Sequence, residues 1–206
     1  VMSSLLDIVI LDAEWTAWEG SMQRDWSGEG EYREIVQISA VKIYDLETLH
    51  NSKLFSVFTK PTINPKLSEY FINLTGINQQ QLELIGINFI EGAKLFSDFA
   101  GNSHCLSWGN DIKRINDNLN LISSNYNLDI QRNSDIRNLF RGLNVDITGY
   151  TSGLIDSYSD TPSIIKPGNN HNALSDCISM VSALSKLERS IGKKMMIEKI
   201  EKLENI

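Results

Sequence analysis

Ile8-Val9-Ile10-Leu11-Asp12-Ala13-Glu14 is the stretch of sequence on which the fold prediction depends. Four consecutive apolar residues followed by Asp-x-Glu predict a buried strand that ends in two acids. Because strand side chains alternate between faces, Asp12 and Glu14 should point the same way. Two carboxylates held a few ångströms apart repel each other unless a divalent cation lies between them, and Mg²⁺ or Mn²⁺ suits such oxygen ligands. The pair therefore indicates a candidate metal site.

The same pattern occurs a second time, so the pair means little when taken alone. Asp45-Leu46-Glu47 follows Ile43-Tyr44 and leads towards a point where the chain turns into a new strand. We therefore expect this second pair to lie on a solvated turn. Asp12 and Glu14 by themselves fit an exposed strand end as well as a metal site, and the rest of the chain has to decide between the two.

The chain has 206 residues, of which 41% are hydrophobic and 22% charged, close to soluble globular averages. This length predicts one domain, residues 1–190, followed by a C-terminal helical extension, residues 191–206. No stretch approaches the roughly 20 apolar residues that span a bilayer, and the N-terminus lacks a basic region followed by an apolar one. We therefore expect a soluble, cytoplasmic protein with no membrane contact.

Charge and cysteine content narrow the class further. The net charge of −7 argues against broad electrostatic binding to long nucleic acid, which needs basic surface. An enzyme that grips only a chain end through metal ions remains compatible with it. Cys105 and Cys177 each lie in an apolar segment, so they are predicted to be buried thiols in a reducing compartment.

Periodicity predicts alternating strands and helices along the chain. Residues 34–44 and 53–58 should be antiparallel neighbours in an opening sheet with the first strand. The polar stretch 21–33 should be a surface loop, with Trp18 and Trp26 either packed against the body or available to stack on bases. We also expect a strand at 105–108, helices at 88–101, 112–122, 135–143 and 172–188, one short helix after a turn at 74–77, and an irregular segment at 149–167.

Acids and a histidine recur at later turns. Asp111 follows a predicted strand at the start of a helix, where a carboxylate is exposed and is stabilised by the helix N-terminus. His171 precedes Asp176 by five residues, a His-x-x-x-x-Asp spacing that occurs once in the chain. Together with Asp12 and Glu14, and in this order, these residues resemble the motifs of the DEDDh branch of the DnaQ-like 3′-to-5′ exonucleases.

Connecting motifs narrow the resemblance to the subgroup that includes histone-mRNA and small-RNA exonucleases and their bacterial relatives. They are Leu11-Asp12-Ala13-Glu14-Trp15-Thr16, Glu34-Ile35-Val36-Gln37-Ile38-Ser39-Ala40-Val41, Pro65-Lys66-Leu67-Ser68, Leu74-Thr75-Gly76-Ile77 and Ser107-Trp108-Gly109. The loop 149–170 and the segment after Gly192 lie outside the resemblance. Because the spacing after Trp108-Gly109 varies in the family, Asp117 is the alternative to Asp111.

The resemblance implies an α/β fold with a ribonuclease H-like, mixed five-stranded sheet flanked by helices. It also implies two Mg²⁺ or Mn²⁺ ions, held by Asp12, Glu14, Asp111 and Asp176. Asp12 would bridge both ions, Glu14 and Asp176 would complete the site on the side of the attacking water, and Asp111 would support the second ion. His171 is the expected general base, because a histidine pKa lies near operating pH.

Helical geometry constrains where this base can lie. Five residues along a regular helix turn through about 500°, which leaves two side chains roughly 140° apart. His171 and Asp176 cannot then face one site from within a single helix. We expect His171 on the loop just before the helix, with Gly168 and the neighbouring asparagines allowing that loop to move, and Asp176 inside the helix.

The substrate implied is a single-stranded 3′ end, with RNA favoured over DNA, from which nucleoside 5′-monophosphates are released. Trp15 and Thr16 should lie near the terminal nucleotide, and Leu74 and Ile77 resemble the apolar wall for its base. Such stacking accepts any base, so little sequence specificity is expected. Arg114, Arg137 and Arg141 are candidates for phosphate contacts, although a solvated helix face is the simpler interpretation of each.

Two other functions stay open at this stage. One is a catalytically silent, exonuclease-like module that binds nucleic acid or a protein. The other is a proofreading exonuclease that joins a polymerase through the tail after Gly192. Residues 191–206 repeat apolar side chains at helical spacing, so they could pack on the body, on a protein partner or on a second copy of the chain. The physiological substrate and the oligomeric state are not set by the sequence.

Overall fold

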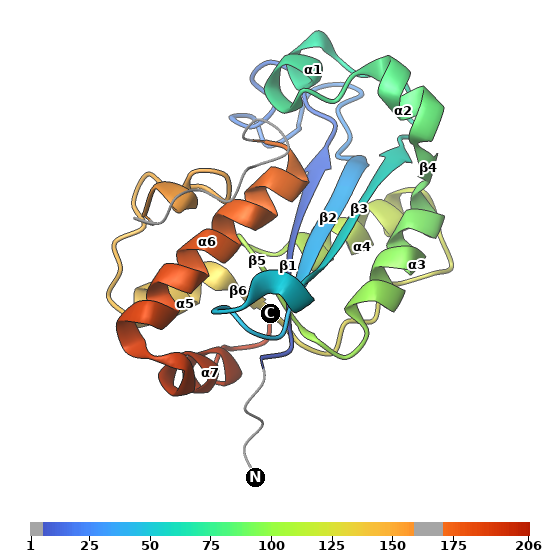
Figure 1. Ribbon diagram of the computed structural model, residues 1–206. Coiled ribbons are helices and arrows are strands. Elements are labelled where there is room, and N and C mark those ends of the chain that lie inside the picture. The colour runs from blue at the N-terminus through green and yellow to red at the C-terminus, as the bar shows by residue number, and fades with distance from the viewer. Residues whose placement is uncertain (1–5, 159–170) are drawn as a thin grey trace.

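A six-stranded sheet of mixed direction forms the centre of the molecule in the computed structural model, which describes residues 6–158 and 171–206 (Figure 1). The strand order is β4-β3-β2-β1-β5-β6, so β1 lies inside the sheet. It pairs antiparallel with β2 and parallel with β5. The strands are β1 (Ile8–Trp15), β2 (Ile35–Ile43), β3 (Lys53–Lys60), β4 (Ile87–Asn88), β5 (His104–Ser107) and β6 (Asn133–Asp135).

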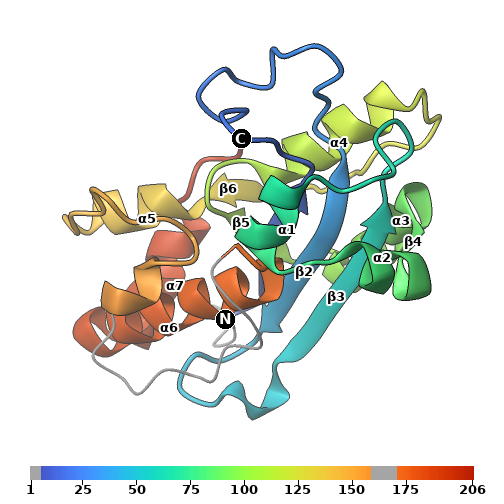
Figure 2. The ribbon, with the colours of Figure 1, turned by 90° about the horizontal axis from the view of Figure 1, so that it is seen from above.

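Helices cover both faces of this sheet. Helices α3 and α4 lie on one face, and α5, α6 and α7 on the other (Figure 2). Helices α1 and α2 lie beyond the carboxyl end of β1 (Figure 1). The helices are α1 (Glu69–Thr75), α2 (Gln79–Ile85), α3 (Phe89–Ala100), α4 (Asp111–Leu121), α5 (Ile136–Gly142), α6 (Ala173–Ile191) and α7 (Lys193–Glu201), with short 3₁₀ turns η1 (Leu49–Asn51) and η2 (Ile155–Tyr158).

Side chains of β1 divide between the two helical layers. Val9 and Leu11 pack with α3 and α4, whereas Ile8 and Ile10 pack with α5, α6 and α7. The alternation continues into the polar end of the strand, so Asp12 and Glu14 share the face that α6 covers. The first strand thus aims both acids at the helix that carries Asp176.

The start of α6 is fixed to the sheet by hydrogen bonds. Asn172 caps the helix by accepting from the backbone N–H of Ser175. The backbone N–H of Ala173, the first residue of α6, donates to the side-chain oxygen of Gln37 on β2 at 2.9 Å. Gln37 lies opposite Glu14 in the β1–β2 register. The helix therefore begins beside the acidic end of β1, which sets the position of whatever its first turn carries.

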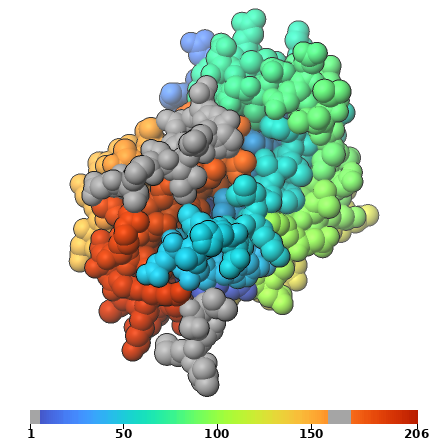
Figure 3. Space-filling view, in the orientation of Figure 1, coloured from blue at the N-terminus to red at the C-terminus, as the bar shows by residue number. Residues whose placement is uncertain are grey.

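The C-terminal helix belongs to the same core. On α7, Met196 and Ile200 are buried in the cluster that contains α5 and α6. Lys193 pairs with Asp45 at 2.8 Å, and the N–H of Ile206 donates to β6. In the space-filling view, α7 and the end of α6 form one continuous surface (Figure 3). The apolar side of this helix is therefore occupied by the chain's own core.

The sheet has six strands instead of the five that the family resemblance implied. Two of the six are too short to leave a hydrophobic pattern in the sequence. β4 has two residues and β6 has three, Asn133-Ser134-Asp135, without alternating hydrophobicity. The single short helix expected after residues 74–77 is accompanied by an earlier one, α1, which begins at the Ser68 cap. The antiparallel pairing of β1, β2 and β3 is confirmed.

Some expectations concern segments at the edge of the described chain. The irregular segment from 149 is described as far as residue 158 and contains η2, which packs on α6. Gly168 and the two asparagines before His171 lie outside the described residues, as does the remainder of that segment. Among the described helices, none has the length and apolar character needed to cross a membrane.

Candidate active site

Asp12 and Glu14 lie at the carboxyl end of β1, where the parallel neighbour has already ended. The pairing of β1 with β5 stops at Ile10, so the end of β1 borders an opening in the sheet. Asp12 is buried, with 6% of its surface exposed, and Glu14 is half-buried. A carboxylate this buried needs a compensating partner, because desolvation strongly disfavours its charge.

Asp111 approaches this opening from the other side. The chain leaves β5, and Asn110 caps α4 by accepting from the N–H of Lys113 at 2.9 Å. Asp111 is the first residue of α4, and its carboxylate accepts a hydrogen bond from the backbone N–H of Ala13 at 3.2 Å. The acid therefore takes the place on β1 that a longer β5 would have filled.

His171 and Asp176 complete the cluster from the start of α6. His171 lies just before the Asn172 cap, in agreement with the angular argument, and its backbone is in the left-handed region at φ +64°. Its N–H donates to Asp176 at 3.2 Å. Ser152 donates to the other oxygen of this carboxylate at 3.1 Å. Each oxygen of the Asp176 carboxylate therefore accepts a hydrogen bond, one from His171 and one from Ser152.

One pocket collects these side chains. Its volume is about 150 Å³. The five residues predicted from the motifs all line it, and so do eight others. Its lining is Asp12, Ala13, Glu14, Trp15, Ala17, Met22, Trp26, Leu74, Trp108, Asp111, Ser152, His171 and Asp176. Asp117, the alternative to Asp111, is instead paired with Lys113 and Arg114 elsewhere on α4.

The acids in this pocket raise one another's pKa. For Asp12, burial is the largest cause and the charges of the three other acids add to it. For Glu14, burial again comes first, followed by the charges of Asp176 and Asp111. Burial raises the pKa of Asp111 to about 7, against the hydrogen bond from the N–H of Ala13. The cluster thus lacks the positive charge that would offset its ionised form.

The family follows from a match over most of the chain. A model of the exonuclease family, RNase_T, matches residues 9–184. The chain belongs to this exonuclease family. A comparison with curated proteins gives no match.

Solved structures of similar fold include DEDDh 3′-exonucleases. The nuclease domain of 3′hExo, a DEDDh family member bound to rAMP, is 21% identical, with a TM-score of 0.73 and coverage of 94% of this chain and 96% of that one. A 3′-exonuclease that recognises the histone mRNA stem-loop is 20% identical, with a TM-score of 0.70 over 92% and 84%. The cell-death related nuclease CRN-4 is 19% identical, with a TM-score of 0.69; it covers 91% of this chain, which spans only 65% of it. At these identities the likeness shows the ribonuclease H-like fold.

The exonuclease site has a donor set that fits divalent metal. Glu14, His171 and Asp176 each offer a ligand atom, and these atoms lie within 4.8 Å of one another. Asp12 and Asp111 add two further carboxylates to the same pocket. Oxygen ligands of this kind suit Mg²⁺ and Mn²⁺, and cations would offset the repulsion that raises the pKa of the acids. The residues therefore fit the metal site that the family implies.

The four predicted substrate residues of this exonuclease separate into two pairs. Trp15, at the end of β1, and Leu74, on α1, line the pocket. Thr16 and Ile77 are buried and are not among the lining residues. The hydroxyl of Thr16 donates to the carbonyl of Tyr32 at 2.6 Å, so it closes the loop that leaves β1. Ile77 lies in the core beneath α1 and α2.

Among the polar and aromatic residues that line the pocket, Ser152 and Trp108 were given no role in the site from the sequence. Ser152 lies in a segment without periodicity or a family motif, so no signal in the sequence could have assigned it to Asp176. Gly153 beside it approaches the same carboxylate so closely that an added Cβ would lie 2.5 Å from an oxygen. Trp108 belongs to the Ser107-Trp108-Gly109 motif, and its place three residues before Asp111 was a usable signal.

The thiol of Cys177 lies behind the acids. It is buried and donates to the carbonyl of Ser39 at 3.4 Å. Burial, and then the charges of the pocket acids, raise its pKa well above the ordinary value. Both cysteines are free and buried, as predicted. Cys177 is therefore packing material beneath the site rather than a nucleophile.

Proposed function

We propose that this protein is a metal-dependent 3′-to-5′ exonuclease that removes nucleoside 5′-monophosphates from single-stranded nucleic acid. One observation carries the proposal: four carboxylates and a histidine from β1, α4 and the start of α6 line a single pocket. Their mutual repulsion needs cations, and phosphodiester hydrolysis is the chemistry that paired divalent ions promote.

The chain's own residues divide the work. Asp12, Glu14, Asp111 and Asp176 would hold two Mg²⁺ or Mn²⁺ ions, which supply charge stabilisation for the phosphate and the leaving oxygen when bound. His171 accepts the proton of the attacking water, from a position next to Glu14 and Asp176. The loop residues Ser152 and Gly153 fix the orientation of Asp176.

The terminal nucleotide would lie on the side of Trp15 and Leu74. Their rings and methyl groups offer a surface for any base, because stacking reads the face of a base rather than its edge. RNA is the favoured substrate, since one solved relative contains rAMP and another recognises a histone mRNA stem-loop. The preference for RNA is tested by comparing RNA and DNA oligonucleotides as substrates.

The two Asp-x-Glu pairs of the chain provide a matched test. Single-stranded RNA and DNA oligonucleotides, labelled at the 5′ or the 3′ end, are incubated with Mg²⁺ or Mn²⁺, with and without EDTA. Wild type should shorten 5′-labelled strands stepwise, and Glu14→Gln should be at least about 100-fold slower. Glu47→Gln, the equivalent change at the exposed glutamate of the second pair, should match wild type.

Other outcomes would exclude the proposal. Cleavage in EDTA, stepwise loss from the 5′ end, or full activity of Glu14→Gln would each contradict it. Absence of cleavage on every substrate, with binding retained, would identify a silent binding module instead.

A further inference from the structure

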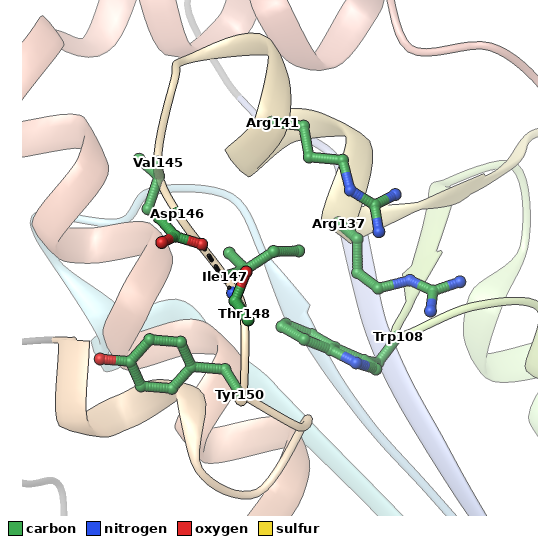
Figure 4. A pocket seen from close by; sticks show the side chains of 8 residues that line it. All are labelled: Trp108, Arg137, Arg141, Val145, Asp146, Ile147, Thr148 and Tyr150. Atoms are coloured by element: carbon green, nitrogen blue, oxygen red, sulfur yellow. Dashed lines mark hydrogen bonds between the residues drawn. The ribbon is translucent and has the colours of Figure 1, made fainter.

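A second pocket lies beside the acid site, between α5 and the segment 145–150. Its volume is about 340 Å³, within the range of about 300–1,000 Å³ typical of ligand pockets. Arg137 and Arg141 extend into it from α5 in the same direction, with Trp108 below them (Figure 4). Thr148 and Tyr150 line the opposite side. Guanidinium groups can bind the phosphate of a nucleotide, and aromatic rings can stack on its base, so this pocket holds both kinds of side chain that a nucleotide needs.

This pocket adjoins the proposed catalytic pocket through one side chain. Trp108 lines both of them. Arg137 provides a second connection: its pKa is raised first by its hydrogen bonds to Asp135 and also by the charge of Asp111, so its guanidinium lies within electrostatic reach of the acids. A strand whose cleaved phosphate lies at the acids would therefore meet this pocket one nucleotide away.

The arginines differ in how they are held. Arg137 is clamped by Asp135, with its Nε 2.9 Å from each carboxylate oxygen. Asp135 also accepts from the N–H of Gly109 at 3.2 Å, which fixes the pair against the turn that carries Trp108. Arg141 is exposed and donates only to the side chain of Asn138, at 3.2 Å, among the hydrogen bonds of the described residues. Arg141 is thus the cation best able to receive a phosphate.

A third pocket also adjoins the catalytic one, but it has the wrong charge for the strand. Trp15 and Trp26 line both of these pockets, and the volume of the third is about 250 Å³. Three acids and two arginines line it: Asp25, Glu31, Asp117, Arg33 and Arg114. Both of these arginines are already in ion pairs. At α5, Arg137 is also in an ion pair, with Asp135, but no ion pair among the described residues includes Arg141, so a phosphate backbone favours that side.

We propose that the pocket formed by Trp108, Arg137, Arg141 and Tyr150 binds the nucleotide on the 5′ side of the cleaved bond. Arg141 contacts its phosphate, and Trp108 and Tyr150 contact its base. This inference rests on the proposed function and adds a direction to it: the strand enters past α5, and its last nucleotide lies towards Trp15. For full activity the enzyme should then need a nucleotide that carries a 5′-phosphate on the 5′ side of the cleaved bond, as in a trinucleotide.

Two substrates separate this pocket from the chemistry. The p-nitrophenyl ester of thymidine 5′-monophosphate has no nucleotide on the 5′ side of its cleaved bond, whereas a trinucleotide has. Arg141→Gln should lower kcat/KM for the trinucleotide about tenfold, as expected for one lost charge-assisted contact. It should leave the ester unchanged. Arg33→Gln, which removes an arginine from the third pocket, is the matched control and should change neither.

Salt dependence gives an independent measurement. Binding of a 5′-fluorescent oligonucleotide is followed in EDTA, so that no hydrolysis occurs. Losing one phosphate contact should reduce the slope of log affinity against log salt by about 0.7 in Arg141→Gln. Arg33→Gln should keep the wild-type slope.

The outcomes distinguish failure of this pocket from failure of the proposed function. Equal losses of Arg141→Gln on ester and trinucleotide, no loss on either, or a trinucleotide defect in Arg33→Gln alone would overturn the assignment of the pocket. If wild type cleaves neither substrate, the exonuclease proposal fails. The salt slope then still decides whether Arg141 contacts a strand: an unchanged slope refutes it, and a reduced slope supports it.

Discussion

Asp111→Asn should make the metal-free protein more stable at high pH, because it removes a buried acid that resists ionisation. Asparagine keeps the shape of the side chain and an oxygen that can accept from the N–H of Ala13. Burial raises the pKa of Asp111 from 3.8 to about 7. The folded state therefore holds this proton more tightly than the unfolded state does.

The sign and size follow from proton linkage. The contribution of Asp111 to stability is fully present below about pH 4 and is lost as pH rises through about 7. Between pH 5 and pH 8 this loss amounts to about 3 kcal/mol, at 1.36 kcal/mol per pH unit. Wild type in EDTA should therefore lose about 3 kcal/mol more over this interval than Asp111→Asn does.

Urea unfolding in EDTA at pH 5 and pH 8 measures this difference. Asp117→Asn is the control on the same helix, because its carboxylate is 43% exposed and paired with Lys113; it should differ from wild type by less than about 1 kcal/mol. Mg²⁺ at about 100 times its dissociation constant should restore about 2.7 kcal/mol to wild type at pH 8. Equal pH dependence of wild type and Asp111→Asn, or no stabilisation by metal, would refute the reasoning.

Three further substitutions test the base, the loop and the tail. His171→Asn should lower kcat about 10²- to 10⁴-fold while Mn²⁺ binding persists in calorimetry; loss of binding would make this side chain a ligand instead of a base. Gly153→Ala should reduce hydrolysis of the oligonucleotide at least about tenfold, because its Cβ would push on a catalytic carboxylate, whereas Gly142→Ala, with open space around it, should be as active as wild type. Met196→Ala should cost about 2–5 kcal/mol in urea unfolding, against a small change for the exposed Met195→Ala; similar values would show that α7 is not part of the core.

The fold was predictable where a pattern was long enough to repeat. Four apolar residues from Ile8, followed by Asp-x-Glu, were enough to predict both the strand and the shared face of its acids, and the helix that carries Asp176 shows its apolar side over many turns. β4 and β6 have too few residues to show any period. They form because longer strands beside them leave backbone groups to pair, which is a tertiary cause.

The site was predictable where motif and geometry agreed. The five-residue spacing from Asp176 predicted His171 outside the helix, and the strand-to-helix turn favoured Asp111 over Asp117. Ser152 could not have been found, because its contact with Asp176 joins residues 24 positions apart in the sequence. Long-range contacts of this kind arise from how the loop packs and leave no local signal in the sequence.

The central claim is that the acids of β1, α4 and α6 form one site for two divalent ions. Calorimetric titration of the metal-free protein with Mn²⁺, in the presence of AMP as the product, tests it most directly. Wild type should bind two ions per chain, and Asp12→Asn should lose both or bind them with a much lower affinity. Undiminished Mn²⁺ binding by Asp12→Asn, or no binding by wild type, would contradict it.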